Sequence, residues 1–208
     1  MIYKPATTTG FTLVEVLVAI TILLLVITGP MQIMTRANNS TAYSSEQVIA
    51  FFLAQEGLEL AQKGRDDLML ADFRDEFGGT GAPNPWAQFR TDFDPCLNVA
   101  GCGLAWNMDT TPDSIAAPLN CATLDSCRLN VREAGTTNRD RYTYAPVSPV
   151  ITPSKYTRTI RMQQVTGVAG GHDRGMMVTA TVTWRTGSLI AGQQVELSTY
   201  LANVYDRP

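Results

Sequence analysis

The sequence predicts an α+β fold in which a long N-terminal helix packs on a C-terminal antiparallel sheet. Residues 11–34 are nearly all apolar, and apolar side chains continue at helical spacing to about residue 63. Residues 149–208 instead alternate apolar side chains with threonine, the period-two pattern of a half-buried strand. Because a sheet with one apolar face needs a cover, we expect the helix to supply it.

Composition divides the 208 residues into five segments. We expect a leader (1–10), a membrane-spanning half-helix (11–34), a soluble half-helix (35–63), a loop-rich insertion (64–148) and the sheet (149–208). About 170 residues follow the span, which suits one modest domain. The net charge of -3 gives no general basic signature for nucleic acid.

Glu15 is the most informative residue of the predicted span. Residues 11–34 are long enough to cross a bilayer core, which needs about 20 apolar residues. An acid at mid-membrane costs about 2.5 to 3.5 kcal/mol, and Glu15, one turn inside the start, costs less. A carboxylate in such a segment predicts a functional site with a specific partner.

Residues 10–15, Gly-Phe-Thr-Leu-Val-Glu, followed by the apolar run, resemble the prepilin signal of type IV pilins and type II secretion pseudopilins. The resemblance implies cytoplasmic cleavage between Gly10 and Phe11 by a prepilin peptidase, and N-methylation of the new Phe11 amine. In that family the fifth mature residue is a glutamate, here Glu15. It further implies assembly with other pilin subunits through a platform in the cytoplasmic membrane. The N-terminus would be cytoplasmic and the bulk of the chain extracytoplasmic, reaching the periplasm or the cell exterior after filament assembly.

Charge pairing gives Glu15 a physical role. Cleavage would place a cationic Phe11 amine one helical turn from the Glu15 carboxylate, and pairing offsets much of the desolvation cost of both. The helix N-terminus itself also favours an acid. Whether the amine belongs to the same subunit or to a neighbour stays open. The alternative is a plain signal anchor with a tolerated acid.

Two further positions bear on the helix. Gly29 and Pro30 interrupt it near the membrane exit, where proline removes a backbone hydrogen bond. The resemblance implies local melting there in a filament, whereas the alternative is a tolerated membrane-helix proline. Gly64 is predicted to end the helix.

The cysteines favour an oxidising compartment. Five residues separate Cys96 from Cys102, and five separate Cys121 from Cys127. An even count there predicts two disulfides, and we favour the two local pairs, although sequence does not fix connectivity. A four-thiolate zinc site is the alternative, but structural zinc usually has closer ligand pairs. We expect no cofactor.

The secondary-structure pattern of the sequence is weak in the insertion and clear in the sheet. Glycines 78, 79 and 81 with Pro83 and Pro85 predict a break, and residues 86–93 a short helix or turn. Asn107, Asp109 and Asp113 lack the spacing of a calcium loop. Three strands are expected near residues 156–163, 178–185 and 195–201, with Arg158 interrupting the apolar face of the first, and residues 141–147 are a candidate for another.

Catalytic motifs are not evident: His172 is a single histidine in a glycine-rich turn. We therefore expect a structural subunit, and the large irregular insertion favours a minor pilin or pseudopilin. The alternative is an adhesin-like or ligand- or DNA-binding pilin that displays residues 78–148 at a filament tip. A nucleic-acid partner lacks support, although Arg128, Arg132, Arg139 and Arg141 are candidates for a basic patch. A membrane-anchored enzyme is a third hypothesis, and pilus, secretion and DNA-uptake systems are not distinguished.

Overall fold

A computed structural model describes residues 10–76, 84–107, 114–123, 126–132, 141–166, 173–186 and 192–203. The chain forms two compact units, Met1–Ser45 and Glu46–Pro208, which are treated separately below. Several residues considered above lie outside the described ranges, namely most of the leader, the glycines at 78–81, Pro83, Asp109, Asp113, Arg139 and His172.

Helix α1 runs from Leu13 to Glu76, so the prediction that Gly64 ends it is wrong. Gly64 serves a different purpose, because a Cβ atom there would lie 2.3 Å from Cζ of Phe93. The missing side chain lets the Phe93 ring approach the helix backbone. A glycine that permits close packing was thus interpreted as a helix stop.

Three long strands form most of the described sheet in the second unit. They are β5 (Ile151–Thr166), β6 (Asp173–Trp184) and β7 (Gln193–Ala202), all antiparallel. In their register Ile160 lies opposite Ala180, which lies opposite Leu197. The alternation of apolar residues and threonine is therefore that of a meander with one buried face.

Short strands extend the sheet within the region predicted as loop-rich. They are β1 (Cys102–Gly103), β2 (Leu119–Asn120), β3 (Arg128–Arg132) and β4 (Tyr142–Thr143). Among the described strands the order is β2-β1-β5-β3-β4, and β6 pairs with both β5 and β7. β5 is thus the strand on which the insertion is built.

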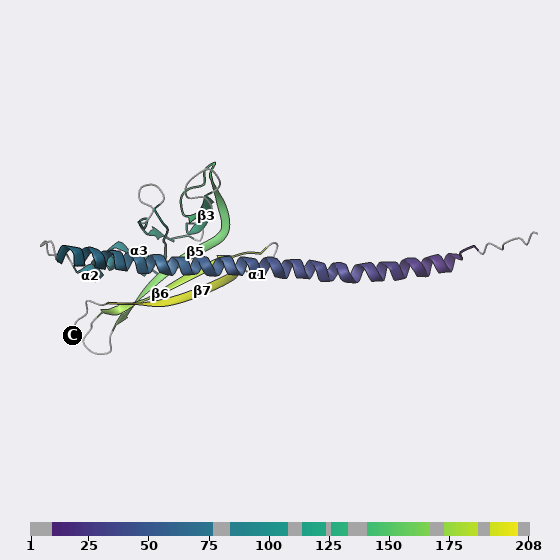
Figure 1. Ribbon diagram of the computed structural model, residues 1–208, viewed down its shortest axis with the longest axis horizontal. Coiled ribbons are helices and arrows are strands. Elements are labelled where there is room, and N and C mark those ends of the chain that lie inside the picture. The colour runs from purple at the N-terminus through teal and green to yellow at the C-terminus, as the bar shows by residue number, and fades with distance from the viewer. Residues whose placement is uncertain are drawn as a thin grey trace, which may run out of the picture. The chain divides into compact units, whose positions relative to one another are not determined.

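The apolar face of this sheet packs on the part of α1 that belongs to the second unit (Figure 1). Side chains from the helix (Ala50, Leu53, Ala54, Leu60, Ala61) and from β5 and β6 (Tyr156, Ile160, Met162, Val178, Val182, Trp184) are buried. Gly57 permits a close approach here, since a Cβ atom on it would lie 3.0 Å from Cδ1 of Ile160. The predicted α+β arrangement is confirmed.

An aromatic cluster joins the insertion to α1. Helix α2 (Pro85–Asp92) is capped by Asn84, whose side chain accepts from the Trp86 and Ala87 amides, and α3 (Asp94–Leu97) follows. The ring centroids of Phe89 and Phe93 lie 4.6 Å apart, and both side chains are buried. The expected short helix after residue 85 therefore anchors the insertion on the core.

Candidate functional site

The bond between Gly10 and Phe11 lies in exposed chain just before α1. Phe11 is 83% exposed, and a Cβ atom on Gly10 would meet nothing within 4 Å. The helix begins two residues after Phe11, at Leu13. A protease acting at this bond therefore meets no helical backbone at the bond itself.

Thr12 caps the first turn of α1. Its Oγ1 accepts a hydrogen bond from the Glu15 amide at 3.3 Å, and its carbonyl accepts from the Val16 amide at 3.2 Å. Thr12 and Glu15 have the spacing of a capping box, a signal that our sequence analysis missed. Glu15 thus occupies a position where the helix dipole favours an acid, independently of any other partner.

Glu15 shares one apolar surface of the helix with Phe11, Val16, Ala19, Ile20 and Leu23. Each of these side chains is exposed in the first unit. In the uncleaved chain the Phe11 nitrogen is a peptide amide, so the cation expected to pair with Glu15 would arise only on cleavage. The surface consequently presents a single carboxylate among apolar groups.

Helix α1 has the composition of a membrane span. An 18-residue window within it has a mean hydropathy of 2.5, and none of that window is buried. The helix continues through Gly29 and Pro30, although Pro30 has no N–H to donate to the Val26 carbonyl. Local melting at these residues stays a prediction.

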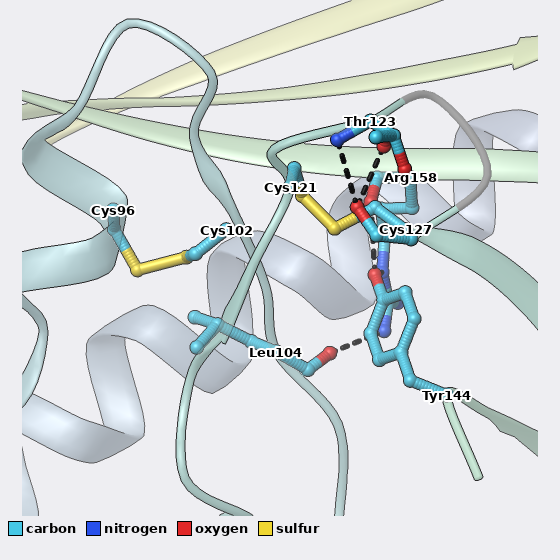
Figure 2. Close-up of a disulfide and its surroundings, with 9 residues drawn as sticks. Cys96, Cys102, Leu104, Cys121, Thr123, Cys127, Tyr144 and Arg158 are labelled. Carbon is cyan, nitrogen blue, oxygen red and sulfur yellow. Dashed lines mark hydrogen bonds between the residues drawn. A yellow bond between two sulfur atoms is a disulfide. The ribbon is translucent and has the colours of Figure 1, made fainter. Parts of the chain in front are cut away.

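The four cysteines form two local disulfides, Cys96–Cys102 and Cys121–Cys127 (Figure 2). The first joins α3 to β1, and the second joins the segment after β2 to the segment before β3. All four side chains are at most 8% exposed. Because a disulfide sulfur is not a thiolate, the zinc alternative does not fit this pairing.

Arg158 of β5, which was interpreted as an interruption of the apolar face, is fully buried on that face. Its Nη1 donates to Glu56 Oε2 at 2.6 Å and to the Leu53 carbonyl at 3.0 Å, both on α1. Its Nη2 donates to the Leu104 carbonyl at 2.5 Å. Figure 2 shows Arg158 beside Leu104 and Tyr144 of the insertion. One cation therefore connects helix, sheet and insertion.

The surroundings of Arg158 keep it charged. Burial by itself lowers the pKa of its guanidinium, but Tyr144 and Glu56 more than compensate, and the pKa is raised overall. Nε of Arg158 donates to the Tyr144 hydroxyl at 3.2 Å, and that hydroxyl donates to the Arg158 carbonyl at 2.9 Å. The network is structural, since its donors and acceptors bond one another.

Residues 7–29 match the family model described as the prokaryotic N-terminal methylation motif. The chain carries the type IV pilin and pseudopilin signal. Gly10, Phe11 and Glu15 all lie within the matched residues. Neither a curated protein nor a solved structure matches the chain. The comparison therefore bears on the N-terminus, and the rest of the molecule is interpreted from its own structure.

The methylation motif supports a pilin- or pseudopilin-like precursor that is anchored in a membrane. It suggests a structural subunit rather than an enzyme, and it implies a prepilin peptidase and other pilins as partners. The long helix on an antiparallel sheet is a pilin-like arrangement, reached from residues outside the motif. Motif and fold therefore point in the same direction.

The other sites that the sequence suggested are a metal site and a basic patch. Among the described residues, no group of three or more His, Cys, Asp and Glu side chains is placed to hold a metal ion. Arg128 and Arg132 both lie on β3 but line different hollows, so the structure does not join these two in one basic patch. Arg141 is exposed next to β4.

Proposed function

We propose that the chain is the precursor of a minor subunit of a type IV pilus-like filament. A prepilin peptidase cleaves it between Gly10 and Phe11, and the new Phe11 amine is methylated. The exposed, non-helical Gly10–Phe11 bond within the methylation motif carries this proposal. The apolar segment that follows anchors the subunit, with its N-terminus in the cytoplasm and its second unit outside.

Cleavage would create a cationic partner for the Glu15 carboxylate, for which the described part of the chain offers no side-chain partner. The new amine is a cation one turn from the carboxylate, at the end of an exposed apolar helix face. A neighbouring subunit that packs on this face brings a second amine into reach, and pairing offsets the burial of both charges. Charge pairing between subunits would then set their axial stagger in the filament.

The assignment as a minor subunit rests on the insertion. Two disulfides, the aromatic cluster on α2 and the short strands β1 to β4 add an ordered structure to the helix and the three long strands. A repeating scaffold needs only the helix and a sheet that covers it. The additional structure favours a specialised position.

Intact-mass analysis tests the processing step. The chain is produced in cells with a prepilin peptidase and in matched cells without it, then purified in detergent. We expect a mature chain that begins at N-methylated Phe11 in the first cells, and a chain that retains Met1 to Gly10 in the second. If the leader stays on the chain in both, or is removed at another bond, the proposed function is wrong.

A further inference from the structure

Three basic side chains, Arg128, Lys155 and Arg185, line one hollow of the second unit. Arg128 of β3 is in register with Thr157 of β5, which is in register with Thr183 of β6. Lys155 lies two positions along β5 from Thr157 and so projects to the same face as that threonine, and Arg185 directly follows Trp184, the last residue of β6. These five side chains line one hollow, together with Trp184 and Gly192.

The lining has the chemistry of an oxyanion site. Arg128, Lys155 and Arg185 are exposed, and no carboxylate is among the described residues that line the hollow. The Arg128 guanidinium is oriented, because its Nε donates to the Ser154 carbonyl at 2.7 Å. One guanidinium group can donate two parallel hydrogen bonds to two oxygens of a phosphate, and threonine hydroxyls can donate further hydrogen bonds. The chain as a whole carries a net charge of -3, so this concentration of cations is local.

The chain holds this hollow within reach of the membrane. Lys155 pairs with the Glu46 carboxylate, and the Thr186 hydroxyl bonds to it as well. Glu46 is the first residue of the second unit, and it follows Met34, the last residue of the predicted span, by 12 positions. A segment of that length extends at most about 40 Å. Because Glu46 partly neutralises Lys155, Arg128 and Arg185 supply most of the positive charge.

We propose that this hollow binds the phosphate of an anionic phospholipid headgroup on the outer surface of the membrane. The tether to the span keeps the hollow near a surface dense in phosphate, at a high effective concentration. Binding would hold the soluble unit at the bilayer until the subunit is extracted. The proposal relies on the membrane anchor of the proposed function but needs neither cleavage nor filament assembly.

Native mass spectrometry of the full chain in detergent micelles tests the site. The chain is titrated with phosphatidylglycerol and, separately, with phosphatidylcholine. We expect the variant R128Q/R185Q to bind phosphatidylglycerol at least about tenfold more weakly than the unmodified chain, because it lacks two basic contacts to the anionic headgroup. Its affinity for phosphatidylcholine should be unchanged. The matched control R141Q/R174Q removes the same charge from two exposed arginines outside the hollow and should bind both lipids like the unmodified chain.

Two further arms identify the source of the phosphate. Millimolar inorganic phosphate should compete with phosphatidylglycerol in the unmodified chain but not further weaken R128Q/R185Q. A single-stranded oligonucleotide that binds more tightly than phosphatidylglycerol, through the same arginines, would overturn the lipid assignment in favour of nucleic acid.

Equal losses in the test and control variants, or no loss in either, would show that the hollow is not the site. If R128Q/R185Q fails to fold, the single variants R128Q and R185Q carry the same comparison. The uncleaved precursor is used throughout. A failed processing experiment and a failed lipid experiment therefore contradict different proposals.

Discussion

Nη1 of Arg158 lies 2.6 Å from Oε2 of Glu56, and this ion pair crosses the interface between α1 and β5. The arginine side chain is fully buried, whereas 31% of the glutamate side chain is exposed. The pair fixes which turn of the helix faces which residue of the central strand. An unpaired cation in that interior is costly, so removal of the Glu56 carboxylate should lower the free energy of unfolding of the second unit.

We expect Glu56→Gln to destabilise the second unit by about 3 kcal/mol or more, because it leaves a buried cation without its counter-charge. Urea unfolding of the detergent-solubilised chain, followed by tryptophan fluorescence, measures the change. Glu59→Gln is the matched control, since Glu59 is exposed on the same helix and bonds only to Gln55 among the interactions described. The double variant E56L/R158M should recover part of the loss. Equal effects of Glu56→Gln and Glu59→Gln would show that the pair contributes little.

Gly64→Ala tests close packing against helix propensity. Alanine is the better helix former by about 1 kcal/mol, so propensity alone predicts stabilisation. The structure predicts the opposite sign, because the new Cβ would lie 2.3 Å from the Phe93 ring, and overpacking costs about 1 to 3 kcal/mol. The free energies of unfolding of G64A, of F93L and of the double variant separate the effect of helix propensity from that of close packing. The smaller leucine side chain in F93L should make the alanine harmless, and a stabilised single variant G64A would mean that the ring moves aside freely.

Gly64 and Arg158 were both interpreted from local pattern. The helix stop at Gly64 is wrong, whereas Arg158 does lie on the apolar face that it was expected to interrupt, but with a role that the pattern did not indicate. Their roles depend on partners that are distant in sequence, Phe93 for the glycine and Glu56 for the arginine. A single sequence holds no direct signal for such contacts. The acid at Glu56, within an otherwise apolar helical stripe, was the one available indication.

What the sequence did predict depended on period and spacing. The two halves of α1, the alternation of β6 and the covering of the sheet follow from residues that repeat along their own element. The segment Gly10 to Glu15 was recognisable because its residues are close together. The hollow at Arg128 and Arg185 was not predictable, because only the register of β3, β5 and β6 brings those side chains to one hollow.

Tyr156 predicts an alkaline limit to stability. Burial, then the neighbouring Tyr142 and Glu46, raises the pKa of its hydroxyl from 10.0 to about 12. Because the pKa of Tyr156 is higher in the folded than in the unfolded chain, its neutral hydroxyl contributes to the free energy of unfolding. This contribution is complete below pH 10 and is lost as the pH rises toward 12. Tyr156→Phe removes the ionisable group, so the unfolding free energy measured between these values should fall less steeply than in the unmodified chain. Parallel curves would contradict the assignment to Tyr156.

Substitutions of Glu15 and Thr12 distinguish two roles for the first turn of α1, charge pairing with the Phe11 amine and helix capping. Glu15→Gln and Glu15→Ala should still be cleaved after Gly10, because the exposed bond precedes the helix, but they should enter filaments poorly for lack of a counter-charge to the Phe11 amine. Thr12→Val is the matched control: it removes the cap that Thr12 Oγ1 offers to the Glu15 amide while keeping the carboxylate. Intact mass of the membrane-bound chain reports cleavage, and immunoblotting of sheared filaments reports incorporation. We expect T12V to incorporate and the two Glu15 variants to remain in the membrane. Normal incorporation of E15Q and E15A would show that the charge is dispensable, and a failure of T12V alone would assign the role of this turn to capping.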